Sequence, residues 1–134
     1  MTVTETKFDT QRHHIHLDII VYNNKGVEYS VDAILDTGAP TTEFSDSFLY
    51  FIRFVDSIDS AITTKPGLQS QKYNRIVLPE IVICGHTINN YNVCVSHFQD
   101  SWGVDALIGL DFFRMFQIKI EYSRGVITAS PFIH

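Results

Sequence analysis

The sequence is poor in basic residues and has no long apolar run. Its 134 residues carry 10 Lys and Arg against 15 Asp and Glu, a net charge of −5, and the basic residues do not cluster. Phosphate backbones are bound by concentrated positive charge, so we expect no nucleic acid partner. No apolar stretch approaches the roughly 20 residues that span a bilayer, so we expect no membrane partner either.

Cysteine is scarce as well. Cys84 and Cys94 are too few for a disulfide framework, and no second pair stands at metal-ligand spacing, so we expect buried free thiols. His14 and His16 share one face of an expected strand, but no Cys, Asp or Glu completes a ligand set, and a solvated strand face explains them. We therefore expect no metal and no cofactor.

The start of the chain lacks the basic segment and apolar core of a secretory signal, which makes a cytoplasmic location the expectation. Hydrophobic residues make up 45% of the chain and charged residues 19%, and no stretch rich in Pro, Gly or Ser divides it. This composition predicts a single folded domain over residues 1–134. We expect residues 1–11 to form a flexible N-terminal arm.

Alternating apolar and polar residues, the period of a β-strand, fill much of the chain. The alternation runs from His14 to Tyr22 and again from Val27 to Leu35, and the turn residues between these segments predict a hairpin. Residues 61–83 predict a second hairpin with its turn at Lys65-Pro66-Gly67. Gly85 and the Asn89-Asn90 pair predict a further turn before a strand over Tyr91–Ser96.

Helical segments are few and short. The aromatic-rich stretch Thr41–Ser60 allows one short helix, with Ser45 or Asp46 as its N-cap. Asp111–Phe116 allows one or two helical turns, and alternation resumes beyond it around a turn at Ser123–Gly125. Together these segments predict a mostly-β domain of roughly seven to nine strands with one or two short helices.

Two short motifs carry the chemistry. Ile34–Ala39 reads Ile-Leu-Asp-Thr-Gly-Ala at the end of an apolar strand, and Ala106–Gly109 reads Ala-Leu-Ile-Gly before a short helix. From about His14 to Ala129 this arrangement resembles the retropepsin-like aspartic proteases, in particular their single-domain bacterial and retroelement members. The resemblance implies a retropepsin-like fold, a closed barrel-like unit that forms a two-fold homodimer and cleaves peptide or protein substrates.

The chemistry of peptide hydrolysis explains why one such motif is not enough. Without a metal or a covalent intermediate, one carboxylate must take a proton from water while a neighbouring carboxylic acid protonates the carbonyl oxygen. Two carboxyl groups within about 3 Å of each other share one proton. The chain contains a single Asp-Thr-Gly, at Asp36, so the second carboxyl must come from another copy in a two-fold homodimer.

The resemblance also implies roles for individual residues. Asp36, Thr37 and Gly38 are the expected catalytic residues, and Leu107, Ile108 and Gly109 would pack beneath the aspartate loop. A hairpin flap with its tip near Gly67 would close over the substrate. The expected substrate-binding residues are Ala39, Pro40, Pro66, Gly67, Leu68 and Ile108.

Two departures from the family pattern keep other functions open. Pro40 stands where the family usually has Asp, Ser or Thr, and proline has no N–H to donate to a substrate backbone. The flap region holds one glycine, Gly67, where retroviral flaps are rich in glycine. The alternative function is a catalytically silent peptide-binding or dimerisation module of the same fold. The remaining alternatives are an unrelated β protein with Asp36 in a solvated turn, and a protease domain within a longer polyprotein.

Overall fold

The computed structural model describes residues 2–54 and 71–132, and for residues 71–73 it describes the backbone alone. In this part of the chain nine strands and three short helices are present, which confirms the mostly-β prediction. They are β1 (Thr4–Lys7), β2 (His16–Tyr22), β3 (Glu28–Leu35), β4 (Glu43–Ser45), α1 (Asp46–Phe51), β5 (Gln71–Ile83), β6 (His86–His97), the 3-10 helix η1 (Asp100–Trp102), β7 (Ala106–Ile108), α2 (Leu110–Met115), β8 (Phe116–Glu121) and β9 (Val126–Pro131).

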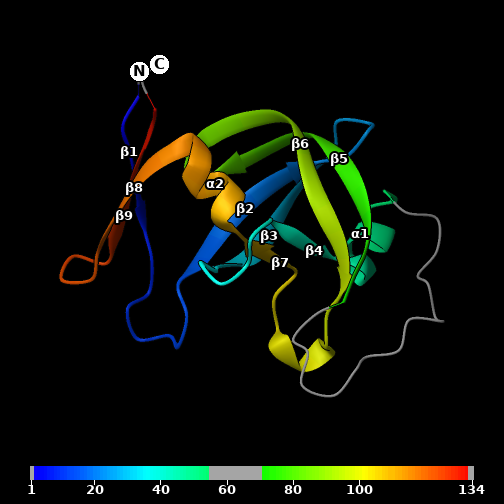
Figure 1. Ribbon diagram of the computed structural model, residues 1–134, viewed down its shortest axis with the longest axis horizontal. Helices are drawn as coiled ribbons and strands as arrows, with labels where there is room; N and C mark the ends of the chain where they lie inside the picture. The colour runs from blue at the N-terminus through cyan, green and yellow to red at the C-terminus, as the bar shows by residue number, and fades with distance from the viewer. Residues whose placement is uncertain (1, 55–70, 133–134) are drawn as a thin grey trace.

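The strands form a closed barrel and a separate small sheet beside it (Figure 1). The barrel has the strand order β2-β3-β7-β4-β6-β5, and the small sheet has the order β1-β9-β8. Most neighbours are antiparallel, but β3 pairs with β7, and β4 with β6, in parallel. These two parallel pairings join segments far apart in the sequence and position the candidate site.

The hairpin predicted before residue 36 is confirmed as β2 and β3. The two strands pair over their whole length, with Ile19 opposite Val31, and both of these side chains are buried. Polar neighbours such as Asp18 point to solvent, as the alternation predicted. Burial of one face fixes the register of β3, because a slip of one residue would turn every apolar side chain outward.

The second long hairpin corrects one prediction. The chain turns at Cys84 and Gly85, both with positive φ, and β6 then continues without a break through the Asn89-Asn90 pair. The predicted turn is confirmed at Gly85 but not at the Asn89-Asn90 pair, where Asn90 takes a positive φ of 53°, which asparagine tolerates, and the chain stays in the strand. The returning strand of the predicted hairpin is confirmed as β5. Its turn at Lys65-Pro66-Gly67 lies outside the described residues.

The two α-helices, α1 and α2, begin close to where the sequence predicted helices. Ser45 caps α1, and its hydroxyl accepts a hydrogen bond from the Phe48 N–H at 3.4 Å. Helix α2 begins directly after Gly109 and sends Phe112 into the barrel core, where the Phe112 and Phe116 ring centroids lie 4.9 Å apart. Among the described residues, no helix is long and apolar enough to cross a membrane.

One buried cluster fills the barrel and extends under α2. Both cysteines belong to the buried residues and neither forms a disulfide, which confirms the prediction of free thiols. Burial raises the pKa of the Cys84 thiol, so this side chain stays protonated and unreactive near neutral pH. The largest fully buried side chains include Leu17, Ile19, Phe44, Leu49, Ile81, Ile108, Phe112 and Ile127.

The predicted flexible N-terminal arm is wrong for the residues that form β1. Thr4 pairs with Ala129 of β9, and its hydroxyl donates to the Cys84 carbonyl at 2.6 Å. Phe8 is buried and packs edge-to-face on Tyr122, with ring centroids 5.1 Å apart. The start of the chain is therefore a structural strand that ties the small sheet to the β5–β6 turn.

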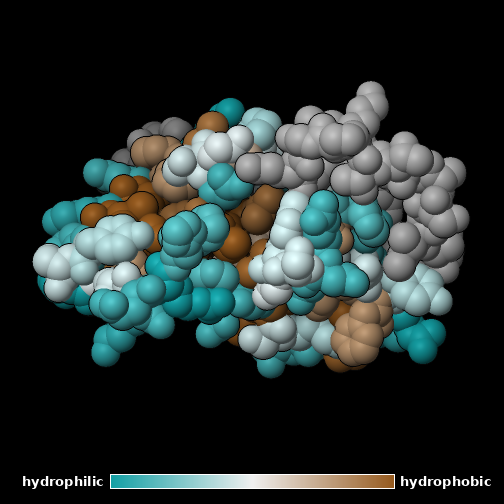
Figure 2. Space-filling model, turned by 90° about the horizontal axis from the view of Figure 1, so that it is seen from below, coloured by the Kyte–Doolittle hydropathy of each residue, from teal (hydrophilic) through white to brown (hydrophobic). Residues whose placement is uncertain are grey.

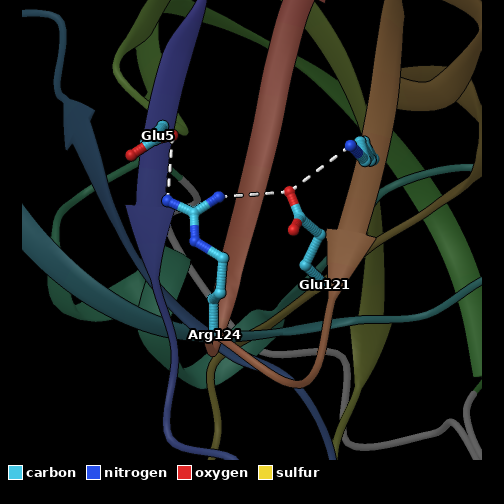
Figure 3. Close-up of polar contacts among 4 residues, drawn as sticks. Glu5, Glu121 and Arg124 are labelled. Atoms are coloured by element: carbon cyan, nitrogen blue, oxygen red, sulfur yellow. Dashed lines mark hydrogen bonds and ion pairs between the residues drawn. The ribbon is translucent and has the colours of Figure 1, made fainter.

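Ion pairs cross the exposed face of the small sheet (Figure 3). Arg124 lies between Glu5 of β1, at 3.4 Å, and Glu121 of β8, at 3.3 Å, and these partners raise the pKa of its guanidinium. The side chains involved are largely exposed, so each pair stabilises the fold by little. The packing of Phe8 on Tyr122 holds the start of the chain to the small sheet more strongly than these ion pairs do.

We predict that Phe8→Ala lowers the free energy of unfolding by about 3 kcal/mol, because it removes a buried aromatic side chain. The matched control is Val3→Ala, five residues earlier, where the side chain is 63% exposed and the change should stay within about 0.5 kcal/mol. Urea denaturation followed by circular dichroism measures both. Equal effects of the two substitutions would support the prediction of a flexible N-terminal arm.

Candidate active site

Asp36 lies directly after β3, beside the second motif. The parallel pairing of β3 and β7 sets Leu35 opposite Ile108, and the Asp36 N–H donates to the Ile108 carbonyl at 2.8 Å. The two motifs that the sequence singled out therefore meet in space. Ile108 itself is fully buried, so its side chain supports the loop from the core. Its expected role in substrate binding stays a prediction.

The aspartate is held in a tight turn by the residues that follow it. The Gly38 N–H donates to Asp36 Oδ1 at 2.9 Å, and the Ala39 N–H donates to the Asp36 carbonyl at 3.2 Å. Thr37 and Gly38 are exposed, whereas Ala39 is buried and its carbonyl accepts from the Leu110 N–H at 2.8 Å. The carboxyl group is thus held by one backbone N–H, that of Gly38, at the end of a buried strand, and Asp36 is partly open to solvent.

A polar clamp that sequence reasoning missed fastens this loop to α2. The Thr42 hydroxyl donates to Asp111 Oδ1 at 2.8 Å, and the Thr42 N–H donates to Asp111 Oδ2 at 3.1 Å. The same carboxylate accepts from the Phe112 N–H at 3.0 Å, at the start of α2. Asp111 therefore joins the end of the aspartate loop to the helix that follows Gly109.

Thr42 has two further partners, which makes it the centre of the clamp. Its oxygen accepts from the Gly109 N–H at 3.2 Å and lies 3.2 Å from the Tyr91 hydroxyl, which donates because Thr42 gives its own proton to Asp111. Burial raises the pKa of Tyr91, which keeps this donor protonated. Thr42 and Asp111 stand close to the two motifs in the sequence, but the sequence does not show that their side chains meet.

Gly109 is required by the closeness of the two backbones. A Cβ at this position would lie 2.6 Å from the Thr41 carbonyl group and 2.7 Å from the Ala39 oxygen, and backbone atoms cannot move aside cheaply. Glycine in the Leu-Ile-Gly motif thus permits the aspartate loop to lie directly on the β7–α2 junction.

The remaining expected substrate-binding residues divide into two groups. Pro40 is exposed next to the turn, and its carbonyl accepts from Arg114 Nη1 at 3.3 Å. Pro66, Gly67 and Leu68 lie outside the described residues, together with the flap that they were expected to form.

A pocket of about 630 Å³ opens beside Asp36. Its apolar lining consists of Ile34, Leu35, Trp102, Val104 and Leu107. Its polar lining consists of Arg12, His13, His14, His16 and Asp36. The chain between β1 and β2 and helix η1 both project on the lower side of Figure 1, and the view from that side shows hydrophobic surface between hydrophilic residues (Figure 2).

Two further carboxylates lie behind the polar wall of the pocket. Asp32 Oδ1 lies 3.0 Å from His16 Nδ1, and Asp32 Oδ2 lies 3.8 Å from Arg12 Nη1, so both side chains contact this carboxylate. The Asp105 N–H donates to the Asp32 carbonyl, and burial, with a smaller contribution from the Asp32 charge, raises the pKa of Asp105. Two histidines elsewhere in the fold also have polar partners: His86 contacts the Ala129 carbonyl, and His97 contacts Asp46 at 3.2 Å.

Comparisons with known proteins agree with this geometry at the level of the fold. No protein-family model matches the sequence, and no curated protein sequence matches it. A crystal structure of a retropepsin-like aspartic protease from Rickettsia conorii matches 96% of this chain and 91% of its own, with a TM-score of 0.65 and 17% identity. The retroviral protease-like domain of Ddi1 from Leishmania major matches 92% of this chain and 97% of its own, with a TM-score of 0.59 and 20% identity.

The chain has the retropepsin-like fold. The resemblance proposed from Asp-Thr-Gly and Leu-Ile-Gly is thereby confirmed, and so is the closed barrel with its short helices. In this retropepsin-like domain Asp36 occupies the end of β3 next to the pocket, and the clamp around Thr42 sets the angle at which the loop leaves the barrel.

We predict that Thr42→Val destabilises the domain by about 1–3 kcal/mol, because it leaves the Gly109 N–H and the Tyr91 hydroxyl buried without their acceptor. Thr87→Val is the control, since Thr87 is exposed on β6 and the change keeps a β-branched side chain in a strand. Thermal or urea unfolding of both variants provides the comparison. If Thr42→Val lowers stability no more than Thr87→Val does, the clamp contributes nothing to stability.

Proposed function

We propose that this domain is an aspartic endopeptidase that works as a two-fold homodimer, with one Asp36 from each copy in a shared active site. The observation that supports it best is the anchoring of Asp36, through the Ile108 carbonyl and the Gly38 N–H, at the edge of a pocket in a retropepsin-like fold. A single Asp36 cannot supply both the base and the acid that the reaction needs.

The two Asp36 carboxyl groups would hold one proton between them. The ionised carboxyl takes a proton from water as the water oxygen attacks the peptide carbonyl carbon, and the protonated carboxyl donates to the carbonyl oxygen. The tetrahedral intermediate then collapses: the C–N bond breaks, and the leaving amine receives a proton from the dyad. Activity is favoured in acidic solution, because the dyad loses its shared proton as the pH rises.

The loop around Asp36 supplies positioning rather than further acid or base groups. The backbone of Gly38 holds one carboxyl oxygen, and Thr37 is exposed and free of the barrel packing, where it can face a second copy. An extended peptide would bind partly as an added strand. Pro40 cannot donate a backbone hydrogen bond to that peptide, so affinity depends more on side-chain pockets.

Pro40 also favours a second candidate function, a peptide-binding module of the same fold without catalysis. The two candidates differ in the products that they leave. Incubation with a diverse peptide pool at several pH values, followed by mass spectrometry, separates them: cleaved peptides support the endopeptidase, and bound but intact peptides support the module.

We predict that Asp36→Asn abolishes cleavage of the peptide pool while the melting temperature and the dimer remain unchanged. Asparagine keeps an oxygen that can accept from the Gly38 N–H, but it can neither take nor give the catalytic proton. Asp18→Asn is the control, because Asp18 is exposed on β2. Cleavage by the Asp36 variant at the wild-type rate would refute the assignment.

We predict that an excess of inactive Asp36→Asn chains suppresses wild-type activity when the two are mixed and allowed to exchange subunits. Each mixed dimer carries one Asp36 in place of two, so wild-type chains are drawn into inactive pairs. Turnover of a labelled peptide against the mixing ratio measures the effect, and light scattering reports the oligomeric state. A monomer whose activity does not respond to the excess contradicts the shared site.

A further inference from the structure

The pocket beside Asp36 has two walls of opposite character. One wall is apolar and rigid: Val104 and Leu107 are buried, and the Trp102 ring packs on Phe98 with ring centroids 5.2 Å apart. Ile34 of β3 completes this wall next to the aspartate. An apolar surface of this kind gains free energy when a bulky apolar side chain covers it.

The other wall carries hydrogen-bond donors and cations. Arg12, His13, His14 and His16 line it, and the one acidic side chain that also lines the pocket is Asp36. Arg12 and His16 contact Asp32, which lies behind them. His13 and His14 are exposed at the rim, with ring centroids 5.3 Å apart, and their imidazoles face solvent.

Imidazole donates N–H hydrogen bonds in both of its protonation states, and it gains a positive charge in the mildly acidic solution that suits a carboxyl dyad. A carboxylate is the side-chain group that best complements such a rim, because charge-assisted hydrogen bonds are shorter and stronger than neutral ones. A lysine or arginine at the same place would meet like charge from Arg12.

We propose that this pocket gives the domain a preference for peptides in which a bulky apolar residue is flanked by an acidic residue. The apolar side chain covers the wall of Ile34, Trp102 and Leu107, and the flanking carboxylate binds His13 and His14. This specificity rests on the proposed endopeptidase function, in which Asp36 acts at the edge of the same pocket.

The test uses peptides that share one Phe and differ at one flanking position, which holds Glu, Gln or Lys, with the position scanned on both sides of the Phe. Cleavage by the wild-type chain gives kcat/KM for each peptide. In parallel, fluorescence anisotropy measures binding of the same labelled peptides to the Asp36→Asn chain, which requires no catalysis.

At the favoured position, we expect kcat/KM for the Glu peptide to exceed that for the Gln peptide by about two- to fivefold, because the contacts join partly exposed charges. The Lys peptide should have the lowest kcat/KM. The double substitution His13→Ala, His14→Ala should remove the difference between Glu and Gln, while the Phe requirement persists. Lys25→Ala is the matched control, because Lys25 is an exposed cation in the turn at the opposite end of β3 from Asp36. This control should keep the wild-type preference.

Failure of the endopeptidase function and failure of the pocket assignment give different results. If no peptide is cleaved but Glu peptides bind the Asp36→Asn chain more tightly than Gln peptides, the endopeptidase function fails and the pocket assignment stands. Equal affinity and equal kcat/KM for Glu, Gln and Lys at every position would overturn the pocket assignment, whether or not cleavage occurs. A Glu preference that survives the double histidine substitution would overturn it too.

Discussion

The geometry of the candidate active site depends on the clamp between Thr42 and Asp111. Backbone hydrogen bonds from Asp36 to Ile108 and from Leu110 to Ala39 bring the aspartate loop onto the β7–α2 junction, but they leave the end of the loop to be fixed. The Thr42 hydroxyl fixes it, because it contacts Asp111, Gly109 and Tyr91 at once. These three contacts satisfy a fully buried hydroxyl, which explains why a small polar residue stands at this position.

The proposed function requires two copies of the chain, because each copy supplies one Asp36. The barrel presents one carboxyl group, a pocket and a tight turn, and the chemistry of amide hydrolysis requires a second carboxyl close by. The retropepsin-like fold alone does not establish catalysis, since one fold carries many functions. Pro40 therefore matters for the proposed function: it has no backbone N–H to donate to a peptide, so the proposed recognition of substrate relies more on the pocket and its histidines.

Sequence patterns predicted the parts of the structure that local physics dictates. The β2–β3 hairpin followed from alternation and turn residues, the start of α1 followed from a capping serine, and the meeting of Asp36 with Ile108 followed from the resemblance carried by the two motifs. The features that the sequence did not predict depend on partners far away in the chain. Thr42 and Asp111 are 69 residues apart, so neither reveals the other. Strand β1 is a short polar segment with no apolar alternation, and it is a strand because β9 pairs with it.

The parallel pairing of β3 with β7 also has a consequence for the order of folding. The β2–β3, β5–β6 and β8–β9 hairpins join neighbouring segments and can form early, because closing a short loop costs little entropy. The junction that seats Asp36 unites distant segments and must wait until those hairpins dock. A partly folded copy thus lacks an assembled Asp36 loop, so the proposed activity has to wait until the barrel has closed.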